Sequence, residues 1–495
     1  MKPKSTFFIF VIFLLISITI NAQISKRTLE ATQKLVAEQK YSEAVLRFEP
    51  YALKNLKNFD VQLYYAQLLM LNGNSHRARL KYRELVNNNP EKYDLKYEYA
   101  HFLVEKGHVE EAIPLLESYL SQNPDHEAAK NDLAKAYYWN GEVEKAQAYS
   151  QKLLSENLQN SEAQNIINEI NNLHTYHASL QFSYSKDNQI TERFGPKLVA
   201  YKYYNSLLTP YIVAKNDWIS GNSKKYHDTQ ILLGNHFSFP SSNLKVEAAV
   251  GFADVGKKDV IGKIRLKKDF LKFIFTEGSI ERKPYNFTLS ALENPIFTNE
   301  AFGAVGLQTK KEVVLKALYQ LNNFGNEGNV SSVAAYILSP PLRLGKYFEI
   351  SVGYSFGYTN SERSNFVSSV SLQDVIANSL TEIPGIYDGY FTPKNQLNNT
   401  SVISLTYKNG KFNWQNSAVL NLSSSADQPV LSVNYQSATP YFETQFYKQN
   451  YSPLNLKSTV NYKFSSKMEA SLTYEFLKTF FYNAHTGSIY FGYVF

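Results

Sequence analysis

Apolar and polar residues alternate along the chain from His174 to its end, and this alternation restricts the fold more than any other feature of the sequence. In residues 176–184 the even positions carry Tyr, Ala, Leu, Phe and Tyr, while the odd positions carry His, Ser, Gln and Ser. A period of two places successive side chains on opposite faces of a β-strand. The same alternation returns at 412–422 and 470–476, so the sequence predicts a sheet of many strands with one apolar face.

The composition of the polar face indicates the surroundings of this sheet. A water-soluble sandwich would carry charges there, whereas these strands carry mostly Ser, Thr, Asn and Gln. Strands of about 9–11 residues can cross a bilayer with apolar side chains toward lipid and polar side chains toward a lumen. A sheet in lipid must close, because its edges find no water there. We count roughly 16 to 19 such segments, without helical periods between them. The preference for even numbers favours a closed antiparallel transmembrane barrel of about 16 strands, with 18 as the alternative.

Composition excludes several classes of function. The 51 Lys and Arg against 44 Asp and Glu give a net charge of only +7, without basic runs, so no nucleic-acid partner is expected. No cysteine is present, which excludes disulfides, thiolate nucleophiles and cysteine metal ligands. His174 and His177 lack the further ligands of a metal site and are interpreted as interfacial residues. Neither a metal nor a cofactor is expected.

One stretch of the sequence matches a known catalytic motif. Residues 353–357, Gly-Tyr-Ser-Phe-Gly, match G-x-S-x-G, but that chemistry needs a sharp turn from a strand into a helix. The residues that follow, 358–362, read as a polar loop, and we find no set of Ser, His and acidic residue elsewhere. We therefore expect a glycine-containing barrel strand here and no enzymatic activity.

The N-terminus has the form of a secretory signal. Lys2 and Lys4 precede an apolar run from Phe7 to Ile20, and Ala22 offers a small residue for cleavage. A helix over this run would rise about 21 Å, which is too short for a hydrocarbon core of about 30 Å. We expect residues 1–22 to be a signal peptide that is removed on export.

Between the signal and the alternating region, the sequence repeats with a step of 34 residues. Small residues at this step would let two helices pack closely, and Gly would mark the turn between them. The repeated positions are Ala66, Ala100 and Ala134, then Gly73, Gly107 and Gly141, then Ala78, Ala112 and Ala146. The pattern resembles the tetratricopeptide repeat family over residues 25–158. The resemblance implies a short α-solenoid of helix pairs within residues 23–173, capped by a last helix at 162–173. Such stacks usually dock a protein or an extended ligand, and a spacer is the alternative.

The C-terminus also carries a signal. Ile489, Phe491, Tyr493 and Phe495 stand at every second position up to the last residue. This ending resembles the final-strand signature that the outer-membrane assembly machinery recognises. That machinery is therefore an expected partner, with Phe491, Tyr493 and Phe495 as its contacts.

Two stretches of the barrel region carry a further resemblance. The first reads Arg-Lys-Pro at 282–284, Leu-Ser at 289–290, Pro-Ile-Phe-Thr at 295–298 and Phe-Gly-Ala-Val at 302–305; the second reads Asp-Gly-Tyr-Phe-Thr-Pro at 388–393. Together they resemble the C-terminal domain of cellulose synthase operon protein C, an outer-membrane cellulose exporter. The residues that carry the resemblance are Arg282, Pro284, Leu289, Ser290, Phe302, Gly303, Gly389, Tyr390, Phe391 and Pro393. Phe302, Ala304 and Asn286 depart from the family's usual residues, and its helical array is longer. Generic barrel turns are the alternative interpretation.

This second resemblance implies export of a newly synthesised, cellulose-like exopolysaccharide. A hydrated glycan needs a polar lumen and aromatic rings that stack on sugar faces, and the barrel region contains both residue types. Segment 359–399 is too long for an ordinary loop. It contains Asp374, Glu382, Asp388, Tyr390 and Phe391, which we expect either to gate the pore and contact the glycan or to stand outside as part of an external loop.

The sequence therefore predicts an α + β multidomain protein with a signal peptide at 1–22, a periplasmic tetratricopeptide repeat domain at 23–173 and an outer-membrane β-barrel at 174–495. Expected partners are outer-membrane lipid, a polysaccharide and, through the repeats, periplasmic or inner-membrane synthase components. The alternatives are a general outer-membrane channel for small solutes and a barrel-anchored periplasmic scaffold for protein partners. A plugged lumen would favour the scaffold.

Overall fold

The computed structural model describes residues 26–189, 191–271, 273–309, 312–345, 347–437 and 439–495. The chain divides between Asn168 and Glu169 into two compact units, one helical and one built mainly of strands. The predicted signal peptide, residues 1–22, lies outside the described residues.

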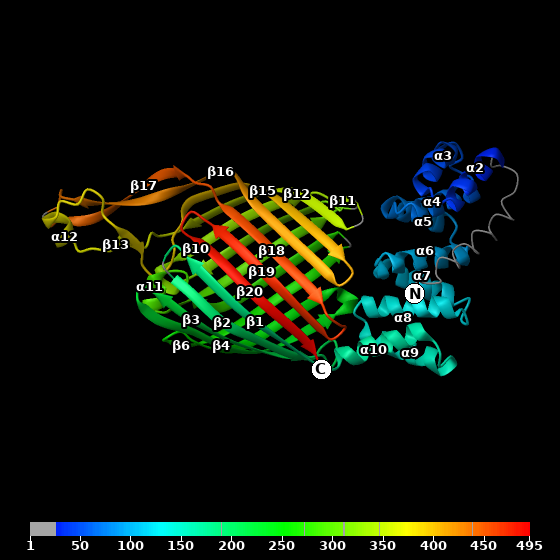
Figure 1. The fold of residues 1–495 in the computed structure, drawn as a ribbon, viewed down its shortest axis with the longest axis horizontal. Coiled ribbons are helices and arrows are strands. Elements are labelled where there is room, and N and C mark those ends of the chain that lie inside the picture. The colour runs from blue at the N-terminus through cyan, green and yellow to red at the C-terminus, as the bar shows by residue number, and fades with distance from the viewer. Residues whose placement is uncertain (1–25, 190, 272, 310–311, 346, 438) are drawn as a thin grey trace. The chain divides into compact units, whose positions relative to one another are not determined.

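The helical unit is a series of antiparallel helix pairs (Figure 1). Its helices are α2 (Lys26–Ala37), α3 (Tyr41–Lys54), α4 (Phe59–Leu71), α5 (Ser75–Asn88), α6 (Tyr93–Glu105), α7 (Val109–Leu120), α8 (Glu127–Trp139), α9 (Val143–Glu156) and α10 (Ser161–Leu173). In the part of the chain that the structure describes, no helix has the length and apolar character needed to cross a membrane. The chain passes from α10 into the first strand after His174 and Thr175.

The repeated small residues lie where helices meet. The alanines at the repeated positions are all 0% exposed, so a larger side chain there would push neighbouring helices apart. Gly73, Gly107 and Gly141 follow the first helix of successive pairs with φ of 75°, 75° and 80°, in the left-handed region that favours glycine. The three helices end in the same way. The N–H of the residue after the glycine donates to a carbonyl in the last turn of the helix, as the N–H of Asn74 does to the Leu69 carbonyl at 2.9 Å.

Between the repeats, buried tyrosines are held by carboxylates. The Tyr82 ring stacks on the Tyr99 ring at 5.6 Å with an interplanar angle of 7°. The Tyr82 hydroxyl donates to Glu98 at 2.6 Å, and Gln67 donates to the same oxygen at 2.8 Å. Burial raises the pKa of the Glu98 carboxyl.

The second unit is a closed antiparallel barrel. Sixteen strands of the described residues form the ring: β1 (Tyr176–Asp187), β2 (Thr191–Lys202), β3 (Thr209–Gly221), β4 (Lys224–Phe239), β5 (Leu244–Asp254), β6 (Lys258–Leu271), β7 (Ile274–Tyr285), β8 (Ile296–Gln308), β9 (Val314–Asn323), β10 (Asn329–Leu338), β12 (Phe348–Ser361), β15 (Lys394–Asn409), β16 (Phe412–Asn434), β18 (Leu454–Lys463), β19 (Met468–Lys478) and β20 (Asn483–Val494). Each pairs with the next, and β20 pairs with β1 from His177↔Val494 to Asp187↔Ala484. The predicted barrel of about 16 strands is confirmed.

The outer surface of the ring is apolar. On β5, β7 and β19 the outward side chains of Phe252, Ile280 and Leu472 are 67%, 66% and 57% exposed. Exposed apolar side chains recur on every second residue of most strands, while their neighbours point into the lumen. Water would strongly disfavour so large an apolar belt, whereas lipid would cover it. The predicted transmembrane fold class therefore holds.

The two ends of the barrel differ. At the terminal end, which holds Tyr176 and Val494, neighbouring strands are joined by short connections such as the η1 turn (Pro240–Ser242) and Gly410. Longer loops lie at the opposite end, which we call the loop end. They contain α11 (Leu289–Glu293), β13 (Phe366–Ser368), α12 (Leu372–Ala377), β14 (Gly385–Tyr387) and η2 (Gly325–Glu327). Alternation did not predict α11 and α12, because each is a short helix started locally by a capping hydroxyl, from Thr288 and Ser371.

Two further strands extend the sheet. β11 (Leu342–Leu344) continues the line of β10 along β12, and β17 (Tyr441–Asn450) pairs with the part of β16 beyond the ring. Figure 1 shows β16 and β17 projecting past the loop end together with β13 and α12. An external loop was one of the two alternatives that the sequence left open for 359–399, but the extension of β16 and its pairing with β17 were not predicted.

Candidate functional site

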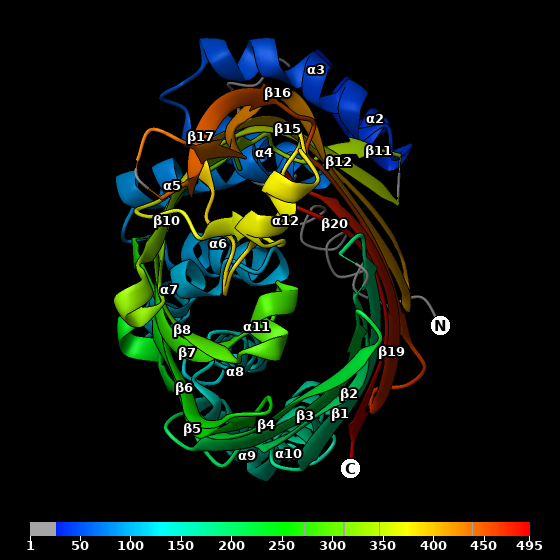
Figure 2. The same ribbon diagram turned by 90° about the vertical axis from the view of Figure 1, so that its left-hand side faces the viewer.

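Segments from several loops meet across the loop end of the barrel. Figure 2 looks along the barrel and shows α11 within the ring of strands, and Figure 1 shows it at the loop end. We call residues 286–293 and 385–393 together the mouth bridge. The first segment follows β7, and the second precedes β15.

Hydrogen bonds join the two segments of the mouth bridge. The Thr288 hydroxyl donates to the Gly389 carbonyl at 2.5 Å, and the Ser290 hydroxyl donates to the Asp388 carboxylate at 2.5 Å. The Gly389 N–H in turn donates to the Ser290 oxygen at 3.0 Å. Gly389 has φ of 78°, which a residue with a side chain would adopt only with strain. The structure thus brings together the two stretches that resemble cellulose synthase operon protein C.

A buried tyrosine fixes the second segment on one side. Tyr390 is 1% exposed, and its ring stacks on Phe324 at 3.7 Å with an interplanar angle of 10°. Its hydroxyl donates to the Glu327 carbonyl at 2.8 Å. The next residue, Phe391, donates its backbone N–H to the Tyr285 hydroxyl at 3.1 Å. Burial raises the pKa of Tyr390, so this hydroxyl stays protonated and remains a donor.

Aromatic contacts carry the bridge to the other side of the ring. The Phe391 ring stacks on Phe481 at 4.4 Å, and Tyr387 contacts Phe481 edge-on at 5.1 Å. Phe481 lies in the loop between β19 and β20, and the neighbouring Tyr482 lies 6.5 Å from Phe287. In the ring order, β7 and β19 are on opposite sides of the barrel. The mouth bridge therefore crosses the opening and does not line one edge of it.

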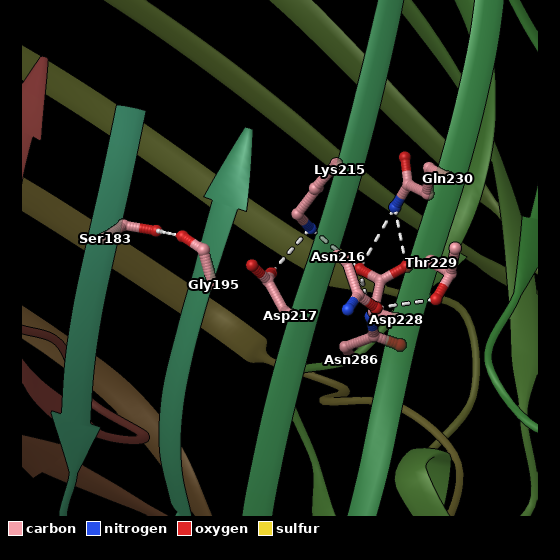
Figure 3. A network of polar contacts seen from close by, with 9 residues as sticks. All are labelled: Ser183, Gly195, Lys215, Asn216, Asp217, Asp228, Thr229, Gln230 and Asn286. Carbon is pink, nitrogen blue, oxygen red and sulfur yellow. Dashed lines mark hydrogen bonds and ion pairs between the residues drawn. The ribbon is translucent and has the colours of Figure 1, made fainter. Parts of the chain in front are cut away.

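A buried carboxylate in the wall anchors the first segment (Figure 3). Asp228 on β4 is 1% exposed and accepts from Lys215 at 2.7 Å and from Gln230 at 2.8 and 3.0 Å. Asn286 donates its amide to the same carboxylate at 3.0 Å. Lys215 also pairs with Asp217 at 2.8 Å. Asn286 departs from the family's usual Thr or Asp, and here it supplies the donor that a buried carboxylate needs.

The predicted gating residues separate into two groups. Asp388, Tyr390 and Phe391 belong to the mouth bridge. Asp374 instead lies in the first turn of the exposed α12, where its carboxylate accepts from the hydroxyl of the capping Ser371 at 2.6 Å. Glu382 is exposed in the same outer part of the loop. Segment 359–399 is therefore divided between the two expected positions: its C-terminal part lies in the mouth of the barrel, and its middle part lies in an external loop.

The remaining residues of the resemblance support the barrel wall around the bridge. Arg282 donates to Asp259 at 2.5 Å and to Asn299 at 3.2 Å. The Pro393 carbonyl accepts both the N–H and the hydroxyl of Ser361 at 2.8 Å. The others occupy regular positions: Pro284 lies in β7, Leu289 begins α11, and Phe302 and Gly303 lie in β8.

The structure also places three other predicted features. Residues 353–357, which match G-x-S-x-G, lie in β12, as expected for a barrel strand, but residues 358–361, interpreted as part of a loop, continue the same strand. His177 stacks on Tyr201 at 4.5 Å, and His174 contacts Tyr203 at 5.3 Å. Phe491, Tyr493 and Phe495 are 51%, 46% and 60% exposed at the end of the chain.

The lumen wall of β2–β9 is charged, which corrects one expectation. The polar face was expected to be mostly Ser, Thr, Asn and Gln, but β6 alone turns Lys263, Arg265 and Lys267 inward, between outward apolar residues. Most of these charges are paired between strands. Lys263 pairs with Glu247 at 2.5 Å and Lys283 with Glu300 at 2.9 Å on neighbouring strands, and Lys316 on β9 pairs with Glu277 on β7 at 2.6 Å, across β8. We call the inward faces of β2–β9 the charged arc. Cross-strand pairing is invisible to a pattern of single residues, so these strands were not distinguished.

The helical repeats carry exposed groups suited to docking. Trp139 is 49% exposed, with the Lys135 ammonium 4.6 Å from its ring centroid. His101 is bound to Asp132 at 2.8 Å, and this carboxylate raises the pKa of His101.

Comparison with known proteins identifies the repeats. Residues 103–170 match the family model "Tetratricopeptide repeat", which confirms that assignment for this part of the helical unit. A search of curated proteins returned no match. Among solved structures, one described as a bacterial polysaccharide outer membrane secretin aligns at a TM-score of 0.47 and 11% identity, covering 65% of this chain and 99% of that one. MamA from Desulfovibrio magneticus RS-1 aligns at 0.28 and 18% identity over 30% of this chain and 82% of its own. YrrB, described as a TPR protein with an unusual peptide-binding site, aligns at 0.26 and 19% identity over 28% and 73%.

Proposed function

We propose that this chain is an outer-membrane channel that exports a newly made exopolysaccharide, and that the mouth bridge is its gate. The observation that carries the proposal is the bridge itself. It joins loops from opposite sides of a closed barrel through a few hydrogen bonds and ring contacts. An opening closed by so few contacts can be released without unfolding the wall, because loops held by few buried contacts open at low cost in free energy.

The chemistry of the lumen favours a glycan as cargo. A hydrated polysaccharide exchanges hydrogen bonds with its surroundings, and the lumen supplies hydroxyl groups such as those of Thr459 and Thr473 and amide groups such as that of Gln415. Hydrogen bonds of this kind contribute only about 1 kcal/mol net, because each replaces one to water. The polysaccharide can therefore move along the lumen wall without being held tightly at any point. Tyr387, Phe391 and Phe481 lie at the mouth, where their rings can stack on sugar faces as the polymer leaves.

The finer assignment is a cellulose-like glycan. The two stretches that resemble the cellulose exporter contact each other in the mouth bridge, where a gate would need them. In this proposal the loop end faces outside the cell and the repeats lie in the periplasm. There they dock synthase components or guide the polymer, and this chain catalyses no reaction.

Single-channel conductance tests the proposal. The full chain in a planar bilayer should conduct weakly, and a variant without residues 385–391 should form a stable, larger pore. Soluble β-glucan oligosaccharides should interrupt the current of that variant. A matched deletion of 372–378, in the outer part of the same loop, should leave the conductance low.

Other outcomes favour the alternatives. Failure of the 385–391 deletion to conduct would exclude export and favour an anchored scaffold. A large pore whose current no glycan interrupts would favour a general channel for small solutes.

A further inference from the structure

The inward faces of the other eight strands differ from the charged arc. These strands are β10, β12, β15, β16, β18, β19, β20 and β1, and we call their inward faces the uncharged arc. One row of residues paired across neighbouring strands crosses most of it: Thr406, Gln415, Thr459, Thr473, Ser488 and Ser183. Each of these side chains carries a hydroxyl or an amide group and no charge.

Charges are rare along this arc. Away from the strand ends, its charged inward side chains among the described residues are Lys457 and Glu475, which pair at 3.6 Å. The hydroxyls bond to each other, as between Thr459 and Thr473 at 3.1 Å and between Ser332 and Thr359 at 3.0 Å. Figure 3 shows the boundary between the arcs, where Ser183 on β1 faces Gly195 and the group around Lys215 and Asp228 begins beyond it.

The two arcs meet different parts of the mouth bridge. The Asn286 anchor bonds to Asp228 on the charged arc. The rings of Tyr387, Phe391 and Phe481 belong instead to loops that join strands of the uncharged arc, namely β12 to β15 and β19 to β20. An uncharged wall therefore leads to an aromatic exit on the same side of the lumen.

We propose that the uncharged arc is the track along which the polymer moves, and that the charged arc is a wall the polymer does not contact closely. This rests on the proposed export function and assigns the path and charge selectivity of the pore. The charged groups of these ion pairs are hydrated, and removing their water would cost more free energy than hydrogen bonds to a neutral sugar can supply. Hydroxyl and amide groups exchange partners with sugar hydroxyls at little net cost, which suits movement. The track therefore selects an uncharged, hydroxyl-rich polymer over an anionic one.

The test uses the full chain with residues 385–391 deleted, so that current can be measured. In this background Thr473→Lys, and separately Ser488→Glu, should reduce the frequency of current blocks by neutral β-glucan oligosaccharides roughly tenfold. Thr473→Lys should also admit blocks by carboxymethylated oligosaccharides. Thr473→Val controls for removal of the hydroxyl without a charge and should change the blocks less than twofold. The matched change on the other wall, Lys316→Gln with Glu277→Gln, should also change them less than twofold.

The outcomes separate the two proposals. The proposed track is wrong, and the export function is unaffected, if neutral oligosaccharides no longer block the Lys316→Gln, Glu277→Gln variant but still block both Thr473→Lys and Ser488→Glu. If the deletion background shows no glycan block at all, the export function fails and the track fails with it. Unchanged single-channel conductance without glycan in each variant verifies that the barrel is folded.

Discussion

The hydroxyl of Ser290 lies 2.5 Å from the carboxylate of Asp388, although the two residues are 98 positions apart in the chain. The pair joins the segment after β7 to the segment before β15 and is the shortest link within the mouth bridge together with Thr288 and Gly389. Whatever opens the mouth has to separate these residues, so this joint is the most direct place to control it.

A disulfide at this joint should lock the mouth. The chain has no cysteine, so Ser290→Cys with Asp388→Cys introduces a single thiol pair whose side chains already meet. We expect the oxidised variant to conduct no better than the unmodified chain, and reduction to raise its open probability, since the native hydrogen bond is gone. Planar-bilayer recording before and after reductant measures this.

Each single cysteine variant is the control and should not respond to reductant. Equal currents in the oxidised and reduced double variant would show that the joint does not limit conduction.

Removing the ring of Phe481 should weaken the far side of the bridge. Phe481→Ala deletes the contacts with Phe391 and Tyr387, and aromatic pairs contribute about 0.5–1.5 kcal/mol beyond their buried area. The open probability should rise about tenfold in single-channel recordings. Tyr435→Ala removes a ring that is 64% exposed at the same end and should have no effect. A similar rise in both variants would contradict a specific role for Phe481.

Asn286 should hold the bridge to the wall. Asn286→Ala removes a hydrogen bond to a buried carboxylate, and such bonds contribute about 1.5–3 kcal/mol. Asn286→Asp should open the mouth further, because it sets a second carboxylate beside Asp228. Gln230→Ala is the matched control: Gln230 donates to the same carboxylate from β4 itself, so its loss should leave the open probability unchanged. Equal opening in the Gln230 variant would mean that the wall, not the bridge, had loosened.

The stability of the repeats should depend on pH through Glu98. Burial raises its pKa above the ordinary 4.5. As pH rises from 4.5 to that raised value, the unfolded chain releases the proton while the folded repeats keep it, so the free energy of unfolding falls. Glu98→Gln removes this slope while an amide can still accept from Tyr82 and Gln67. Thermal unfolding of the full chain in detergent, followed by helical circular dichroism, compares the two; parallel pH profiles would show that Glu98 does not titrate differently on folding.

The barrel could be predicted because every strand repeats the same local rule. Residues such as Leu472 and Thr473 show their faces by alternation alone, and lipid imposes closure of the sheet. The helical repeats were equally accessible, because Gly73 and its counterparts recur at a fixed step.

The mouth bridge could not be predicted as an assembly. Its residues were identified one by one through a resemblance, but contacts such as Tyr285 with Phe391 join loops that have no period and lie 106 positions apart. In the sequence, Asn286 is only a departure from a family pattern. Its role appears when Asp228, 58 positions earlier, is seen beside it. The charged arc was missed for a related reason, since pairs such as Lys316 with Glu277 form between strands that are not consecutive in sequence.

Closure of the ring through β1 and β20 has a consequence for biogenesis. The first strand made finds one of its two partners only when the last residues of the chain arrive, so until then β1 and β19 both present unpaired backbone. Such edges invite pairing with other chains, and contacts between the two ends of a chain form slowly. Until β20 pairs with both β1 and β19, the sheet therefore keeps two open edges, and closure of the ring removes both of them in one step.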